Sequence, residues 1–190
     1  STRALALATE LASELDLPRL RIQAAWFLLR CSPPRPEEAT RILDTALAEL
    51  RDMGSKIDLA EWEQVRALAE LLLGHPRSAE RLAREALLYL SSRPSVEGAQ
   101  ALMTLGDSLV AQGRRDEATQ HYLAAHDTLT AAASGRRSAG PLREVGLRFE
   151  LMGDAGTALK IYRSALSAAN VPSAEHAVRA DHLRRRAFRI

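Results

Sequence analysis

The chain has 190 residues, of which 46% are hydrophobic and 26% are charged, and its formal net charge is +2. This composition is too apolar for a disordered chain, and charged residues interrupt every apolar stretch before it reaches the roughly 18 residues that a membrane helix needs. The nearly balanced charge does not favour a nucleic-acid binder, because such proteins gain affinity mainly by neutralising phosphates. We therefore expect a globular chain without a membrane-spanning segment.

The cysteine content and the N-terminal segment bear on where the protein acts. The one cysteine, Cys31, excludes an internal disulfide framework and suits a reducing compartment. Residues 1–16 are apolar with helical spacing, and they lack the basic start and the cleavage site of a signal peptide. We expect a cytoplasmic location, and we expect the chain to begin inside a larger protein.

The elements expected along the chain are all helices. An aromatic content of 4%, together with many Ala and Leu residues, favours helix-on-helix packing over sheets. Apolar residues recur with a helical period throughout, and Gly and Pro residues separate the periodic segments. The sequence predicts ten helices, over residues 2–15, 19–31, 36–52, 58–73, 77–91, 96–112, 115–132, 141–152, 155–169 and 173–188.

Two consecutive helix pairs share one pattern. Six residues keep the same internal spacing in both copies: Gly106, Leu109, Gly113, Ala118, Tyr122 and Ala125 in the first, and Gly146, Phe149, Gly153, Ala158, Tyr162 and Ala165 in the second. Small residues at Gly106 and Ala118 let paired helices approach closely, and Gly113 ends the first helix. Tyr122 is expected to fill the gap between neighbouring hairpins. The pattern predicts stacked helical hairpins.

Weaker copies of the pattern lie upstream. One consists of Val65, Leu68, Ala69 and Leu72 followed by Ala79, Ala83 and Ala86, and the other of Ile22, Ala25, Trp26 and Leu29 followed by Ala39, Leu43 and Ala46. Residues 1–15 look like the second helix of an earlier, partial repeat, and residues 173–190 look like a capping helix. We therefore expect residues 1–190 to form one repeat domain.

This spacing resembles the tetratricopeptide repeat family. The resemblance rests on Leu105-Gly106-x-x-Leu109 and Val145-Gly146-x-x-Phe149 in first helices, each followed by Ala-x-x-x-Tyr-x-x-Ala in a second helix. It implies a right-handed superhelical solenoid of stacked antiparallel helix pairs. The chain departs from the family pattern because no Trp opens a repeat, because Thr130 and Asn170 stand where a closing Pro is usual, and because residues 131–140 lengthen one connection.

The residues that usually carry catalysis or bind metals do not form a recognisable site. No two of the histidines have the i, i+4 spacing of a metal-binding pair on a helix: His75, His121, His126, His176 and His182. Cys31 has no base nearby in sequence, and no glycine-rich phosphate-binding loop occurs. We predict no metal, no cofactor and no enzymatic activity, and we interpret His126 as a solvated residue on a helix face.

In this family, ligands usually lie in a concave groove lined by the first helix of each hairpin. Carrying over the family pattern places twelve residues there: Gln23, Phe27, Arg30, Glu63, Arg66, Glu70, Met103, Asp107, Val110, Arg143, Leu147 and Glu150. A peptide or helix can place apolar side chains over the apolar members while its charges meet the arginines. The alternative is that some apolar members only pack between hairpins. The Lys and Asn set with which some members bind a chaperone carboxylate is absent.

Basic residues also gather outside this groove. Arg136-Arg137 lie in the long connection, and Arg184-Arg185-Arg186 lie near the C-terminus. Consecutive arginines point in different directions on a helix, so we interpret the C-terminal group first as a solvated cap, second as a contact for a protein partner, and third as a nucleic-acid contact.

The resemblance implies a protein-binding or peptide-binding module. The Ala-rich and Arg-rich composition is similar to that of the C-terminal sensory repeats of actinobacterial helix-turn-helix regulators, in which the repeats bind a peptide or protein signal or mediate dimerisation. A homodimer can form through an exposed terminal helix, whose apolar surface includes Leu5, Leu7 and Leu11. Two alternatives are a free-standing adaptor or scaffold, and a non-catalytic segment of a larger signalling enzyme.

Overall fold

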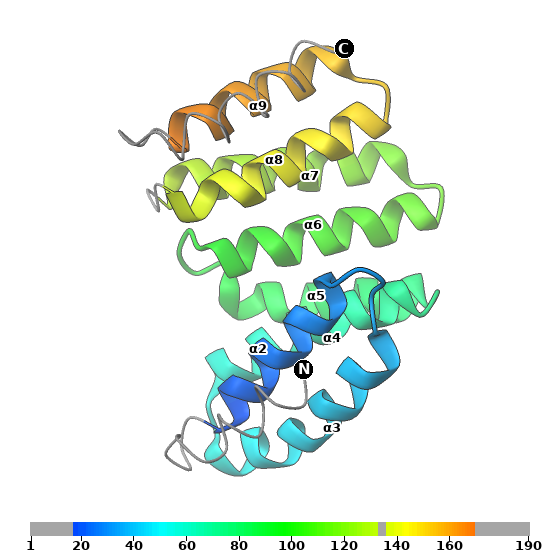
Figure 1. Cartoon of the computed structure of the whole chain (residues 1–190), viewed down its shortest axis with the longest axis vertical. Helices are drawn as coiled ribbons and strands as arrows, with labels where there is room; N and C mark the ends of the chain where they lie inside the picture. Colours follow the sequence, from blue (N-terminus) through cyan, green and yellow to red (C-terminus); the bar gives the residue numbers. More distant parts are fainter. Residues whose placement is uncertain (1–16, 133–135, 170–190) are drawn as a thin grey trace.

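The computed structural model describes residues 17–132 and 136–169, and over these residues the fold is all-α, with eight helices and no strand (Figure 1). The helices are α2 (Leu17–Arg30), α3 (Pro36–Met53), α4 (Lys56–Leu72), α5 (Pro76–Leu90), α6 (Val96–Ala111), α7 (Arg115–Ala131), α8 (Arg136–Leu151) and α9 (Ala155–Ala168). None of them is long and apolar enough to cross a membrane. The predicted helices 2–15 and 173–188, and with them the partial repeat and the cap, lie outside the described residues.

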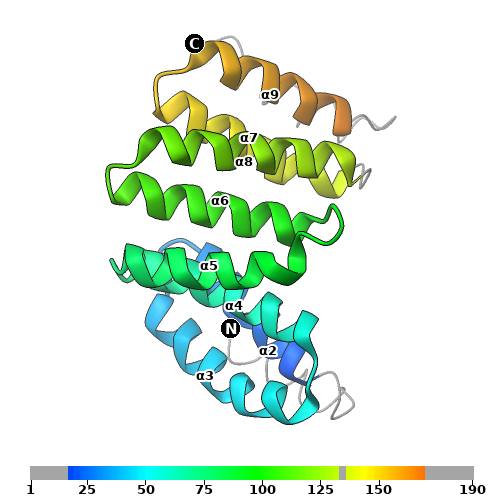
Figure 2. The ribbon, with the colours of Figure 1, turned by 180° about the vertical axis from the view of Figure 1, so that it is seen from behind.

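The helices pack as consecutive antiparallel hairpins. The hairpin partners are α2 with α3, α4 with α5, α6 with α7, and α8 with α9, and α5 packs on α6 as extensively as α2 packs on α3. The first helices of successive hairpins also contact one another, α2 on α4, α4 on α6 and α6 on α8. Figures 1 and 2 show the hairpins following one another along the long axis, with α2 and α8 in front in Figure 1 and α5 and α7 in front in Figure 2.

Local sequence signals set most helix ends. The side chains of Ser55, Ser95 and Asp154 accept hydrogen bonds from backbone N–H groups in the first turns of α4, α6 and α9, at 3.3, 3.0 and 3.0 Å. These N-caps satisfy donors that a helix start leaves without partners. Pro36 and Pro76 begin α3 and α5, where their fixed φ suits the first helical position.

One predicted boundary is wrong. A helix was expected to begin at residue 141, whereas α8 begins at Arg136 and contains Pro141 within its second turn. The buried hydroxyl of Ser138 donates a hydrogen bond to the carbonyl of Leu129, 3.2 Å away on α7, and holds this early turn in place. The connection between α7 and α8 is therefore shorter than the ten residues expected.

Four equivalent hydrogen bonds define the register of the hairpins. In each hairpin a backbone N–H at the start of the second helix donates to a carbonyl near the end of the first, at 2.9 Å in every case: Arg35 to Leu28, His75 to Glu70, Arg114 to Leu109 and Asp154 to Phe149. Three residues before each acceptor stands a small buried residue, namely Ala25, Ala67, Gly106 and Gly146. Ala25 and Ala67 therefore take the place of the glycine in the first two hairpins.

Glycine at this position makes room for a tyrosine. A Cβ added to Gly106 would lie 2.3 Å from the Tyr122 ring, and one added to Gly146 would lie 2.6 Å from the Tyr162 ring. The Tyr122 ring also meets Phe149 of the next hairpin edge-on, with ring centroids 6.1 Å apart. Tyr122 thus packs between hairpins, as the sequence pattern predicted, and it also packs within its own hairpin.

Candidate protein-interaction surface

The predicted groove residues lie on α2, α4, α6 and α8, which together form what we call the first-helix face. The register defined above makes Arg143, Leu147 and Glu150 of α8 equivalent to Met103, Asp107 and Val110 of α6, as predicted. In the first two hairpins the equivalent residues are Ile22, Trp26 and Leu29 on α2, and Gln64, Leu68 and Leu71 on α4. The predicted residues on α2 and α4 are each one or two positions away from these.

This register error has a physical origin in turn length. The donor lies seven positions after the acceptor in the first hairpin, Leu28 to Arg35, and five positions after it in each of the others. The extra residues fall in the Ser32-Pro33-Pro34 stretch. On α4, two alanines two positions apart, Ala67 and Ala69, are both fully buried, so composition alone does not show which one faces the second helix.

The twelve predicted residues differ widely in exposure. Phe27 is 69% exposed, whereas Met103 is 2% exposed and belongs to the core, so Met103 offers no open anchor in this conformation. Gln23 and Arg30 are exposed and Glu70 is buried. The others are half-buried: Glu63, Arg66, Asp107, Val110, Arg143, Leu147 and Glu150.

Several charged residues among the twelve form hydrogen bonds and ion pairs within the chain. Asp107 accepts hydrogen bonds from the Tyr122 hydroxyl and from Nε of Arg148, both at 2.7 Å. Burial and the neighbouring Asp107 raise the pKa of Tyr122, which keeps its hydroxyl protonated and able to donate. Because Arg148 lies on α8 and Asp107 on α6, this cluster fastens the fourth hairpin to the third.

A second cluster fastens the first hairpin to the second. Arg66 of α4 donates to Asp44 of α3 at 2.6 Å and to Glu70 at 2.9 Å. Glu70 also lies 3.0 Å from Nδ1 of His75 at the start of α5. Arg66 and Glu70 are therefore engaged within the chain, although the sequence analysis assigned them to ligand contact.

One ion pair joins helices that are far apart in the chain. Arg30 at the end of α2 pairs with Glu144 on α8, 114 positions away, and its guanidinium also lies over the Trp26 ring at 4.8 Å. Burial lowers the pKa of Arg30, and the positive charges of Arg148 and Arg143 lower it further. The end of α2 and the middle of α8 thus form one cluster of three arginines.

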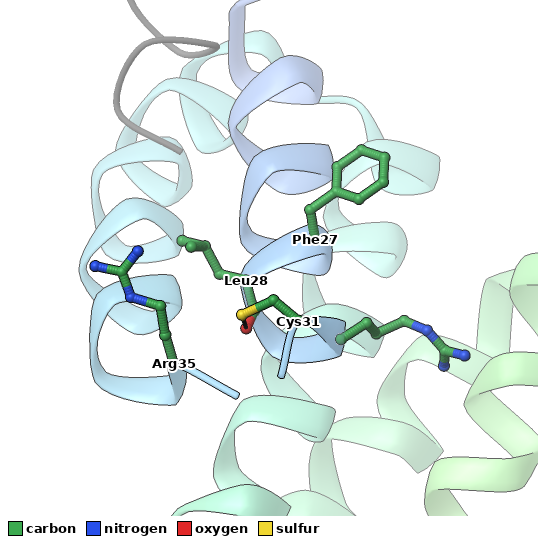
Figure 3. Close-up of a pocket in the computed structure, with 5 residues that line it drawn as sticks. Phe27, Leu28, Cys31 and Arg35 are labelled. Atoms are coloured by element: carbon green, nitrogen blue, oxygen red, sulfur yellow. Dashed lines mark hydrogen bonds between the residues drawn. The ribbon is translucent and has the colours of Figure 1, made fainter. Parts of the chain in front are cut away.

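A shallow pocket opens beside this cluster. It has a volume of about 350 Å³ and is lined by Phe27, Leu28, Arg30, Cys31 and Arg35 (Figure 3). Phe27 extends away from α2, while the Cys31 thiol donates to the Leu28 carbonyl at 3.0 Å. Phe27 and Arg30 were predicted as groove residues, but neither the pocket nor Glu144 was predicted, because residue spacing carries no signal for a contact across 114 positions.

On the second helices of two hairpins, a histidine contacts both a serine and an aspartate, the residue types of a catalytic triad. Nε2 of His126 on α7 lies 3.2 Å from Oγ of Ser164 on α9, and Nδ1 lies 3.0 Å from a carboxylate oxygen of Asp127. The Asp127 side chain is 80% exposed, and Ser164 lies inside a helix whose N–H groups are hydrogen bonded along it. The contact joins α7 to α9. Its partners are 38 positions apart, so spacing did not reveal it.

Among the described residues, no group of three His, Cys, Asp or Glu side chains is arranged to hold a metal ion.

Two comparisons bear on the family of this chain. No protein-family model matches this chain. No curated protein matches it either. The resemblance to tetratricopeptide repeats therefore rests on the residue spacing and on the packing described above.

Proposed function

We propose that the chain is a tetratricopeptide-like solenoid, a right-handed superhelix of stacked hairpins, which binds a protein or peptide through its first-helix face and carries no catalytic activity. The observation that carries this proposal is the repeated hairpin geometry. The same 2.9 Å backbone hydrogen bond recurs in four hairpins, and α2, α4, α6 and α8 adjoin one another on one face. Stacked repeats of this kind form extended recognition surfaces.

The chemistry of the first-helix face supports recognition. Half-buried apolar side chains such as Val110 and Leu147 lie among charged ones such as Arg143 and Glu150. Such a mixture suits a peptide that offers apolar anchors together with charges of both signs. Arg66, Glu70 and Asp107 contribute by holding the hairpins in place.

The cellular setting is a further part of the proposal. Composition supports a cytoplasmic sensory or dimerisation region of a bacterial helix-turn-helix regulator, acting on DNA only through another domain. A free-standing adaptor, or a non-catalytic segment of a larger signalling enzyme, would use the same face. The domain that adjoins this chain in its parent protein distinguishes the three settings.

Partner capture with matched variants tests the function. The face variant Arg143→Glu/Leu147→Glu alters α8, and the control variant Leu88→Glu/Arg93→Glu makes the same chemical changes at exposed positions near the end of α5. We expect wild type and control to retain a common partner, identified by mass spectrometry and reconstituted from purified components, which the folded face variant loses. Retention by the face variant, loss by the control, or no partner with any form would contradict the proposal.

A further inference from the structure

The pair between Arg30 and Glu144 constrains the shape of the first-helix face. Neighbouring packed helices lie about 8 to 10 Å apart, so three steps from α2 through α4 and α6 to α8 would span about 24 to 30 Å on a flat face. That span exceeds the combined reach of one arginine and one glutamate. The pair, whose two guanidinium nitrogens meet both carboxylate oxygens, therefore requires that the face curve inward.

The link between α2 and α8 is made by long side chains. The extensive packing of α2 is against α3 and α4, and that of α8 is against α6, α7 and α9. The Arg30 side chain is 39% exposed and the Glu144 side chain 16%. A partly exposed pair between helices that are not packed together can separate without breaking the core.

The charges around the pair are unequal. Arg30, Arg143 and Arg148 lie close enough that the charges of the other two lower the pKa of Arg30. Two of these arginines form ion pairs with carboxylates: Arg30 pairs with Glu144, and Arg148 pairs with Asp107. Among the described residues, Arg143 has no ion-pair partner. The cluster thus has one positive charge in excess, which attracts an incoming anion.

We propose that the Arg30–Glu144 pair is a latch that holds the first-helix face closed, and that an acidic peptide segment opens it by replacing Glu144 at Arg30 while also pairing with Arg143. This inference rests on the proposed function and names the partner class. The adjoining pocket receives an apolar side chain of the same segment against Phe27 and Leu28, with Arg35 at its rim. Glu144 occupies the position of a ligand carboxylate in the closed state.

The latch is tested first by a distance measurement. Nitroxide labels are placed at Gln23→Cys on α2 and Leu151→Cys on α8, both exposed, in a Cys31→Ser background that removes the one native cysteine. Double electron–electron resonance is expected to give one narrow, short distance in this background. Glu144→Gln should give a longer and broader distribution, and the charge swap Arg30→Glu/Glu144→Arg should restore the short one. Glu85→Gln, which breaks an exposed pair within α5, is the matched control and should change nothing.

The partner class is tested on the same proteins. The probes are hexaglutamate and hexalysine peptides with capped ends, compared at equal ionic strength. Hexaglutamate should lengthen the distance in the Glu144-intact protein, and its affinity should rise about fivefold in Glu144→Gln, which corresponds to about 1 kcal/mol. Its affinity should fall at least as much in Arg143→Gln, and hexalysine should have no effect.

Each outcome decides one part of the inference. Distances that are identical in wild type and Glu144→Gln, with both proteins folded by circular dichroism, would overturn the latch. A working latch that hexaglutamate neither opens nor binds would overturn the acidic partner. Neither result would contradict the proposed function, because that function is tested by loss of the captured partner in the Arg143→Glu/Leu147→Glu variant.

Discussion

Substitution of Gly106 by alanine tests the packing that explains the repeat. The added Cβ would lie 2.3 Å from Cε1 of Tyr122, well inside the distance at which carbon atoms repel. The ring has little room to move, because it is 2% exposed, its hydroxyl donates to Asp107, and its edge meets Phe149. Overpacking of this kind costs about 1 to 3 kcal/mol in the free energy of unfolding.

A double-mutant cycle separates this clash from a general effect of glycine replacement. The equivalent pairs in the first two hairpins are Ala25 with Leu43 and Ala67 with Ala83, so an alanine on the first helix accompanies a smaller partner on the second. We therefore expect Tyr122→Leu to relieve the clash of Gly106→Ala, with an interaction energy of at least about 0.5 kcal/mol. Urea unfolding followed by circular dichroism gives all four values.

Gly156→Ala is the matched control for this cycle. Gly156 is exposed on α9, and an added Cβ would make one ordinary contact, 3.7 Å from an oxygen of Asp154. Alanine favours a helix over glycine, so this variant should gain about 0.5 kcal/mol. The packing argument would be refuted if Gly106→Ala were as stable as Gly156→Ala, or if the two changes at Gly106 and Tyr122 were additive.

Three further predictions concern stability. Burial alone would raise the pKa of Glu80, but hydrogen bonds from Gln112 and two arginines lower it to about 2. The contribution of Glu80 to the free energy of unfolding is therefore complete above the ordinary pKa of 4.5 and is lost as the pH falls toward 2. Glu80→Gln should therefore cost about 1 to 2 kcal/mol at pH 7 and almost nothing near pH 2, and an equal cost at both values in urea unfolding would contradict this. Gln64 is 3% exposed, and its Nε2 has no hydrogen-bond partner among the described residues. Gln64→Leu should therefore stabilise the fold by about 1 kcal/mol. A lower urea concentration at the midpoint of unfolding would show that the amide is needed. Asp154→Ala removes the N-cap of α9 and should cost about 1 kcal/mol, measured in the same way, while unchanged stability would mean that the cap contributes nothing.

Much of the helical architecture could be predicted because its causes are local. A period of 3.6 residues, a capping Ser or Asp, and a Gly at a turn all act within a few residues of the backbone they direct. The recurrence of Gly106 and Tyr122 in two hairpins could be predicted to mark a repeat, whereas the structure shows that the glycine makes room for the tyrosine ring. The start of α8 was missed because Pro141 suggests a helix boundary, while the Ser138 contact that holds the earlier turn depends on α7.

The geometry of the proposed interaction surface could be predicted only in part. The face was predicted from the family pattern, and the register of the backbone hydrogen bonds differs by one or two positions from the predicted one on α2 and α4. Each position rotates a side chain by about 100° around the helix. The exposure of the individual side chains could not be predicted either, since Met103 is buried in the core while Phe27 is 69% exposed. The contact of Arg30 with Glu144 arises from the curvature of three successive hairpin interfaces, which no local pattern encodes.

Hydrogen–deuterium exchange of the chain with and without its captured partner tests the central claim most directly. If the first-helix face is the recognition surface, peptides from α2, α4, α6 and α8 should gain protection on binding, and the Arg143→Glu/Leu147→Glu variant should lose that protection. Protection confined to α5, α7 and α9, with α8 exchanging as in the free protein, would contradict the account and place the binding surface on the second helices.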